Sequence, residues 1–261
     1  MIYIIVCSIT FILSILSLFS GFGLGTVLMP TFALFFPIQL AIAATAVVHL
    51  ANNIFKVILV GKNADWNILI RFGMPAAIAA IVGASLLSFL DKIPILMSYT
   101  LINSIYEITI LKLCIGVIII SFALFEISPF SDKLEFDRKY LPLGGIISGF
   151  FGGLSGNQGA LRSAFLIKAG LSKEVFIGTG TVATVIIDIS RILVYGLTIY
   201  TTNFDALYDE IWLLVLAATA VAFVGTFTAN RLVKKIKLRT IQLTVCIMLV
   251  VVGFGIASGL F

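Results

Sequence analysis

The sequence predicts an all-α polytopic membrane protein, on the basis of three observations. The chain has 261 residues, of which 61% are hydrophobic and only 11% charged, and its mean hydropathy is +1.19. Its apolar residues form solid runs whose length approaches the ~20 residues that a helix needs to cross a bilayer. Gly-rich breaks stand at corresponding places in the two halves. An ordinary soluble enzyme is excluded, because a soluble domain carries about 25% charged residues.

Ten helical segments follow when the apolar runs are cut at charges and at Gly, Pro and Asn clusters. They are 2–20, 26–36, 38–60, 67–90, 104–127, 141–154, 160–170, 173–199, 207–232 and 239–260. Segments 26–36, 141–154 and 160–170 are too short to span, because such helices rise only about 16–21 Å. Short apolar segments that flank the Gly-rich breaks, 20–25 and 152–159, indicate re-entrant half-helices.

The two Gly-rich breaks begin an internal repeat. A shift of 134 residues places Gly25 on Gly159, and after an insertion of eight residues a shift of 142 places Gly83 on Gly225. Each repeat then holds one Gly-rich broken element and three transmembrane helices. The expected organisation is a first transmembrane repeat at 1–127, a cytoplasmic linker at 128–140 and a second transmembrane repeat at 141–261.

The distribution of cations predicts the orientation of the repeats. If each broken element enters and leaves on one side, each repeat makes an odd number of crossings, and the two repeats are inverted. One face then receives only Lys92 and Lys112, and the other receives Lys62, Arg71, Lys133, Arg138, Lys139, Lys168, Lys173, Arg231, Lys234, Lys235, Lys237 and Arg239. Because cytoplasmic loops are rich in Lys and Arg, we expect basic cytoplasmic loops, both termini outside and location in the cell (inner) membrane. The net charge of +5 is explained in this way without a nucleic-acid partner.

Three cations lie away from these loops, namely Lys56, Arg162 and Arg191. Ionisable groups at membrane depth are costly and are therefore functional candidates. Arg191 follows Asp188 by three residues, so the two can neutralise each other on one helix; a substrate or proton role is the alternative. Lys56 lies about one turn from the end of its helix, and we expect its side chain to extend to the cytoplasmic surface.

Arg162 stands in the first turn of the half-helix that begins at Gly159. Free backbone N–H groups at that position favour an anion, and the arginine adds a charge and a fork of donors. Asn157, Gln158 and Ser163 are neutral donors beside it. The sequence therefore predicts an anion site, with a side chain that extends to the cytoplasm as the alternative.

His49 is the only histidine of the chain, and Asn52 and Asn53 follow it near the middle of a predicted span. A buried histidine can carry a coupling proton but more often packs as a neutral, hydrogen-bonded residue. The two asparagines could donate hydrogen bonds into a cavity or, alternatively, form hydrogen bonds between helices.

Neither an enzyme nor a metal or cofactor site is expected. Cys7, Cys114 and Cys246 are isolated, without CxxC or metal-ligand spacing. A single histidine and one intramembrane aspartate provide no catalytic cluster, and the GxGxG string at 21–25 follows no βαβ unit.

Several motifs resemble the sulfite exporter TauE/SafE family (TSUP-type membrane transporters) along essentially the whole chain. The first copy holds GFGLGTVLMP at 21–30, AIAATA at 41–46 and GKNADW at 61–66, and residues 153–159 and 177–181 resemble the second copy. This second copy departs from the family pattern, because Asn157 and Gln158 replace glycines and Arg162-Ser163-Ala164 replaces a proline.

The resemblance implies a secondary transporter, in the export direction, of a small sulfur-containing or organic anion such as sulfite or a sulfonate. Its site is expected between the two half-helix tips at the bilayer midplane, formed by Gly23, Gly25, Thr26, Asn52, Asn53, Asn157, Gln158, Gly159, Arg162 and Ser163. The coupling candidates are His49, Asp188 and Arg191.

A channel-like anion pore or passive facilitator is the alternative function. The expected partners are the small anion, the lipid bilayer and a coupling proton or sodium ion. A homodimer is compatible with the sequence.

Overall fold

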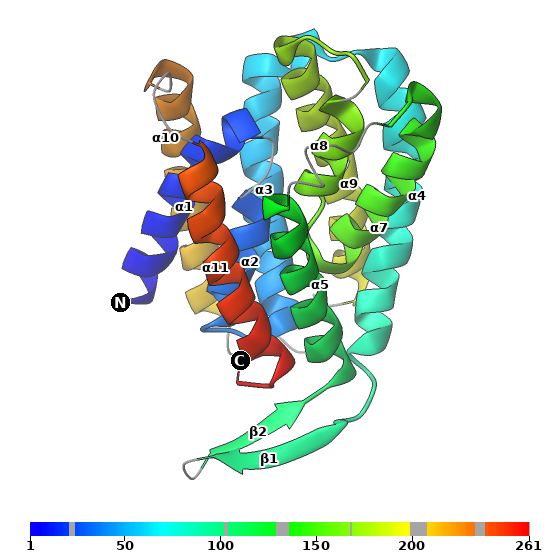
Figure 1. Ribbon diagram of the computed structural model, residues 1–261. Coiled ribbons are helices and arrows are strands. Elements are labelled where there is room, and N and C mark those ends of the chain that lie inside the picture. Colours follow the sequence, from blue (N-terminus) through cyan, green and yellow to red (C-terminus); the bar gives the residue numbers. More distant parts are fainter. Residues whose placement is uncertain are drawn as a thin grey trace.

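The computed structural model describes residues 1–20, 24–101, 104–128, 136–167, 169–198, 208–232 and 238–260. The described residues form a helical bundle with one β-hairpin projecting from one end (Figure 1). The helices of the first half are α1 (Ile2–Ser20), α2 (Leu24–Ala33), α3 (Ile38–Val60), η1 (Gly61–Asn63), α4 (Trp66–Leu90) and α5 (Ile110–Ile127). Those that follow are η2 (Arg138–Tyr140), α7 (Leu141–Ser155), α8 (Gly159–Ile167), α9 (Lys173–Thr198), α10 (Tyr208–Leu232) and α11 (Leu238–Ala257).

These bounds confirm nearly all of the predicted helical segments to within a few residues. Within the described ranges, four stretches are long and apolar enough to cross a membrane, as judged by length and composition. They are Ile38–Asn63, Trp66–Leu90, Lys173–Thr198 and Ile211–Ala229. The described parts of α1, α2, α5 and α11 are shorter apolar helices. The predominantly helical class is therefore confirmed.

The predicted helix 104–127 is wrong at its start. Strand β2 (Ser104–Ile108) pairs with β1 (Met97–Leu101) in an antiparallel hairpin, and α5 begins only at Ile110. Thr109 caps α5, because its side chain accepts a hydrogen bond from the Lys112 N–H at 3.1 Å. The hydroxyl of Tyr99 on β1 donates to the Ser258 carbonyl oxygen at 2.7 Å. The hairpin is thereby fastened to the end of α11.

Two pairs of helices reverse direction inside the bundle. Helices α1 and α2 form one helical hairpin, and α7 and α8 form the other; α2 has 10 residues and α8 has nine. Gly156 ends α7 with φ of +81°, a backbone conformation that glycine adopts without strain. A Cβ atom on Gly25, in the first turn of α2, would lie 3.4 Å from the Gly156 carbonyl oxygen. The two hairpins therefore meet inside the protein.

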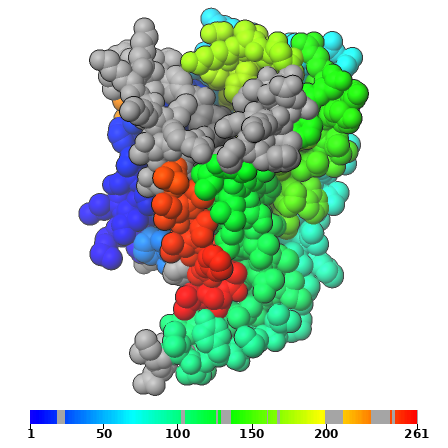
Figure 2. Space-filling view, in the orientation of Figure 1, coloured from blue at the N-terminus to red at the C-terminus, as the bar shows by residue number. Residues whose placement is uncertain are grey.

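The helices of the two halves pack against one another. Helix α1 packs along α10, α4 along α7 and α5 along α11, while α3 contacts α9. Figure 2 shows α5 and α11 side by side on one face of the molecule. The larger buried cluster takes residues from both halves, such as Leu28, Ile42 and Ala222. A second, smaller buried cluster also takes residues from both halves, such as Phe72 and Phe165.

Helices α4 and α7 approach so closely that their backbones touch. Cβ atoms placed on Gly145, Gly149 and Gly153 would lie only 2.1–2.2 Å from carbonyl oxygens of α4, those of Phe72, Ala76 and Ala80. The four-residue spacing places all three glycines on one face of α7. Small residues of this kind allow close helix packing in membranes.

We expect Gly149→Ala to destabilise the folded protein, because its new methyl group would overlap the Ala76 carbonyl. Overpacking of this type costs about 1–3 kcal/mol. Thermal unfolding of the purified protein in detergent should show a clearly lower Tm. Gly196→Ala is the matched control, since a Cβ atom there meets nothing within 4 Å. Equal melting temperatures for the two variants would contradict the close α4–α7 contact.

Candidate functional site

The polar centre of the protein lies where α3 and α9 meet. Helix α3 contributes His49, Asn53 and Lys56, which are four and three residues apart and therefore share one helix face. Helix α9 contributes Thr181, Thr184, Asp188 and Arg191, which share a face for the same reason. Both helices are long enough to span a membrane. Lys56 lies about one turn before the end of α3, and the other groups lie further from the helix ends.

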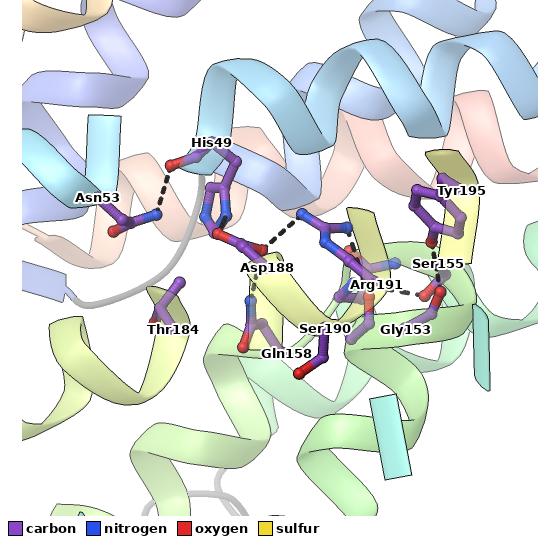
Figure 3. Close-up of polar contacts among 12 residues, drawn as sticks. His49, Asn53, Gly153, Ser155, Gln158, Thr184, Asp188, Ser190, Arg191 and Tyr195 are labelled. Carbon is purple, nitrogen blue, oxygen red and sulfur yellow. Dashed lines mark hydrogen bonds and ion pairs between the residues drawn. The ribbon is translucent and has the colours of Figure 1, made fainter. Parts of the chain in front are cut away.

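Asp188 binds three partners from two halves of the chain (Figure 3). One carboxylate oxygen lies 2.7 Å from His49 Nδ1. The other lies 2.8 Å from a terminal nitrogen of Arg191 and accepts from Gln158 Nε2 at 3.2 Å. The side chains of Asp188 and Arg191 are fully buried. The predicted neutralisation of Arg191 by Asp188 on one helix is confirmed.

The same face of α9 also holds the end of α7. Arg191 donates to the Gly152 carbonyl oxygen at 3.4 Å, and the Tyr195 hydroxyl donates to the Gly153 carbonyl oxygen. A Cβ atom on Gly156 would lie 2.8 Å from a terminal nitrogen of Arg191. Arg191 is therefore packed under the α7–α8 connection, and Figure 3 shows it between Asp188 and Gly153.

A narrow cavity of about 20 Å³ lies beside this cluster. Its apolar wall is formed by Leu18, Leu24, Phe176 and Ile177. Its polar wall is formed by Ser17, His49, Asn53, Lys56, Arg162, Thr181 and Thr184. The cavity thus combines side chains of α1, α2, α3, α8 and α9.

The expectation that Lys56 extends to the surface is wrong. Its side chain is only 4% exposed, and Nζ donates to the Ser17 hydroxyl at 2.8 Å. Lys56 lies on the face of α3 that it shares with His49 and Asn53, so its stem points inward. Helix face, more than distance from the helix end, sets the direction of this side chain.

Arg162 is also buried, with 5% exposure, and the alternative in which it extends to the cytoplasm is wrong. Its guanidinium donates to the Thr184 hydroxyl, and Thr184 in turn donates to the Gly180 carbonyl oxygen at 2.8 Å. Arg162 and Lys56 line the same cavity. Two cations from different halves of the chain are therefore brought together.

The predicted site residues of α2, α3 and α8 differ in whether they line the cavity. Asn52 accepts a hydrogen bond from the Thr226 hydroxyl at 2.8 Å, which connects α3 to α10. Thr26 and Ser163 are buried on α2 and α8 without lining the cavity. Asn53 does line it, and its amide donates to the His49 carbonyl oxygen at 2.8 Å.

The α7–α8 connection holds three more predicted residues. Asn157 is 4% exposed, and neither its amide nitrogen nor its amide oxygen has a hydrogen-bond partner among the described residues. The side-chain nitrogen of Gln158 donates to Asp188, whereas its side-chain oxygen has no partner in the same part of the chain. Gly159 is buried at the start of α8. Gly23 lies outside the described residues.

Sequence reasoning missed Ser17, Thr181 and Thr184 as cavity residues. A usable signal exists for the threonines, since Thr181 and Thr184 precede Asp188 and Arg191 at spacings of three, four and three residues. Such spacing places all four on one stripe of α9. Ser17 carries a similar signal, because Thr10, Ser14 and Ser17 are four and three residues apart and therefore share one face of α1.

The buried charges of the described residues are mainly positive. Lys56, Arg162 and Arg191 are each no more than 5% exposed, against one buried carboxylate, that of Asp188. Charges held away from water need compensation. A cavity lined by two of these cations suits a small anion better than a cation or an uncharged molecule.

The comparisons with known proteins identify the family of the chain. No curated protein and no solved structure matches the chain. The model of the sulfite exporter TauE/SafE family matches residues 6–256, a range that contains every cavity residue. The resemblance carried by the Gly-rich motifs is thereby confirmed. The chain is a multi-pass membrane protein and belongs to the sulfite exporter TauE/SafE family of membrane transporters.

Proposed function

We propose that the protein is a secondary transporter that exports a small sulfur-containing or organic anion, such as sulfite or a sulfonate. The single observation that carries this proposal is the pairing of Lys56 and Arg162 in one buried cavity. Membership of the family implies a membrane transporter of sulfite or related anions. The cavity supplies a location for the anion within such a transporter.

The charge of Lys56 is the main physical reason for an anion. Within the described part of the chain, its hydrogen-bond partner is a neutral hydroxyl, that of Ser17, and no carboxylate lies within ion-pair distance. Asp188 already contacts Arg191 and His49. A buried ammonium is costly without an opposite charge. A bound anion would supply that charge.

The binding site would extend from the cavity to the half-helix tips. Gly25 lies beside both the His49 ring and the Gly156 carbonyl, and the amide of Asn157 is buried without a partner in the described ranges. The backbone N–H groups that open α8 at Gly159 would add donors. We therefore retain the tip residues Gly25, Asn157, Gln158 and Gly159 as members of the proposed site.

Binding would require some movement. A cavity of about 20 Å³ has room for roughly one water molecule, and a sulfite or sulfonate group is larger. Lys56 and Arg162 are long side chains with several rotatable bonds, so rotation of either would enlarge the site. This agrees with alternating access, in which the site changes shape during the cycle.

We infer that the two halves are inverted repeats, with residues 1–127 and 141–261 as the units and 128–140 as the linker. Exchange of the halves converts the α1–α10 contact into the α7–α4 contact and leaves the α3–α9 and α5–α11 contacts unchanged. The paired glycines support this relation. Gly83 packs against the α7 backbone at Phe150, and Gly225 packs against the α1 backbone at Phe11.

The proposed orientation follows from the ends of the helices. Lys62 on η1 lies at the same end of the bundle as Lys173, because η1 contacts the start of α9, whereas Lys92 and Lys112 flank the β-hairpin at the other end. By the positive-inside rule, the η1 end would lie on the cytoplasmic side of the inner membrane. Lys56 lines the cavity one turn before the end of α3, which supports a cavity nearer to the cytoplasmic side. In the proposed export cycle, the anion would enter the cavity from the cytoplasm.

Flux into proteoliposomes tests the function directly. We expect the purified protein to move sulfite or sulfoacetate with saturable kinetics, and unlabelled anion on the far side to accelerate uptake of the labelled anion. Saturation and counterflow are consequences of alternating access. Rapid flux that shows neither would identify a channel-like pore, and no flux of either anion would contradict the proposal.

We expect Arg162→Ala and Lys56→Gln to weaken anion binding without unfolding the protein. A hydrogen bond to a charged group contributes about 1.5–3 kcal/mol, which corresponds to roughly a tenfold to hundredfold loss of affinity. Arg162→Lys keeps the charge but loses the fork, so its affinity should fall between those of wild type and Arg162→Ala. Titration of the purified protein with sulfite measures these constants.

The matched control for Lys56→Gln is Lys62→Gln, which removes the same charge from an exposed position on η1. Its affinity should equal that of the wild type. Unchanged affinity in a folded Arg162→Ala or Lys56→Gln protein would show that these cations serve only to pack the helices.

Arg191 should behave differently, because its partner is Asp188 rather than the substrate. Arg191→Ala leaves a buried carboxylate without its ion pair, and such losses cost about 3–5 kcal/mol. We expect the double variant Asp188→Asn/Arg191→Ala to unfold at a higher temperature than Arg191→Ala. Thermal unfolding in detergent measures this rescue. A double variant that is less stable than Arg191→Ala would contradict the structural role of the pair.

A further inference from the structure

His49 lies between the Asp188 carboxylate and the cavity. Its Nδ1 is 2.7 Å from Asp188, its side chain is 12% exposed, and the ring forms part of the cavity wall. An ionised carboxylate can only accept hydrogen bonds, so Nδ1 carries the hydrogen of a neutral ring. The second nitrogen, Nε2, is then the atom that can bind a further proton.

Gly25 lies beside the edge of the ring that carries Nε2. A Cβ atom there would lie 3.2 Å from both Nε2 and Cδ2 of His49, so glycine leaves space beside this edge of the ring. Asn53 does not occupy Nε2, because its amide donates to the backbone carbonyl of His49 (Figure 3). Among the described side chains, Asp188 therefore binds Nδ1, and Nε2 remains available on the cavity side of the ring.

The charges around His49 determine whether its ring binds a second proton. From α9 it faces Asp188 and Arg191, from its own helix Lys56, and from α8, across the cavity, Arg162. Helix α2 (Leu24–Ala33) carries no charged side chain and places Gly25 beside the ring. Three cations against one carboxylate oppose an imidazolium. An anion in the cavity would add negative charge and favour it.

We propose that His49 takes up a proton at Nε2 when an anion occupies the cavity, so that anion binding and proton binding are coupled at this site. The inference rests on the proposed function, because it requires an anion beside Lys56 and Arg162. The proton comes from water, and the N–H bond is the only bond formed. A monovalent anion and its proton would then be carried together without net charge.

Asp188 and Arg191 are positioning residues in this scheme. Asp188 sets the tautomer and the orientation of the ring through Nδ1. Arg191, 2.8 Å from the other carboxylate oxygen, keeps Asp188 ionised, so that the proton goes to His49. The coupling is reciprocal, because an anion that favours protonation must bind more tightly when the proton is present.

A direct test is possible because His49 is the only histidine in the chain. In protein labelled with ¹⁵N at histidine and purified through a tag without histidine, NMR reports this ring alone. Methanesulfonate and thiosulfate are suitable anions, because neither titrates near neutral pH. We expect the anion to convert the ring from the neutral Nδ1–H form to imidazolium, whereas chloride at equal ionic strength does not.

Calorimetric titration measures the number of protons. In buffers of different ionisation enthalpy, we expect uptake of about one proton per anion, and affinity that rises by at most about tenfold for each unit of decreasing pH. His49→Gln should bind the anion with little proton uptake and a flat pH dependence. Lys62→Gln, on the exposed surface of η1, should retain the coupling.

The outcomes separate this inference from the proposed function. Binding of either anion without proton uptake, or undiminished uptake in His49→Gln, would overturn the coupling at His49 alone. Failure of both anions to bind would overturn the anion site and the coupling together. The NMR readout uses the wild-type chain, so the inference stays testable if His49→Gln does not fold.

Discussion

Asp188 lies where α3, α9 and the α7–α8 connection meet, and its two oxygens contact His49, Arg191 and Gln158. A fully buried carboxylate needs such partners, because desolvation of an unpaired charge would cost several kcal/mol. Each partner comes from a different position in the fold. The ion pair and its hydrogen bonds therefore fix the crossing of α3 and α9, the depth of the α7–α8 connection and the orientation of the cavity histidine.

Much of the fold was predictable because the membrane imposes strong rules on sequence. The apolar runs gave helix bounds that agree closely with α1, α3, α4 and α9, and the short runs correctly indicated half-length helices at α2 and α8. The β-hairpin was missed because β2 was joined to α5 in the predicted segment 104–127, whereas β1 fell between two predicted segments. Only the alternation of Ser98 and Thr100 with larger residues distinguished a strand from a helix.

The candidate site was less predictable, because helix packing is not encoded in spacing alone. The spacing of Asp188 and Arg191 correctly predicted an ion pair, whereas the anion site at Arg162 stays a prediction. The spacing of His49, Asn53 and Lys56 places Lys56 on their shared face of α3, but it does not identify Ser17 of α1 as its partner. Contacts such as Arg162–Thr184 depend on which faces of α8 and α9 meet, and that choice is made by the packing of the whole bundle.

The glycine contacts between α4 and α7 have a mechanical consequence. Backbones that touch at Gly145, Gly149 and Gly153 cannot slide past one another without steric overlap. We therefore expect the two helices to move as one rigid unit. Helix α4 belongs to the first half of the chain and α7 to the second. The halves are therefore not free to swing apart as two separate lobes. Motion that opens the centre has to use bodies that each combine helices from both halves.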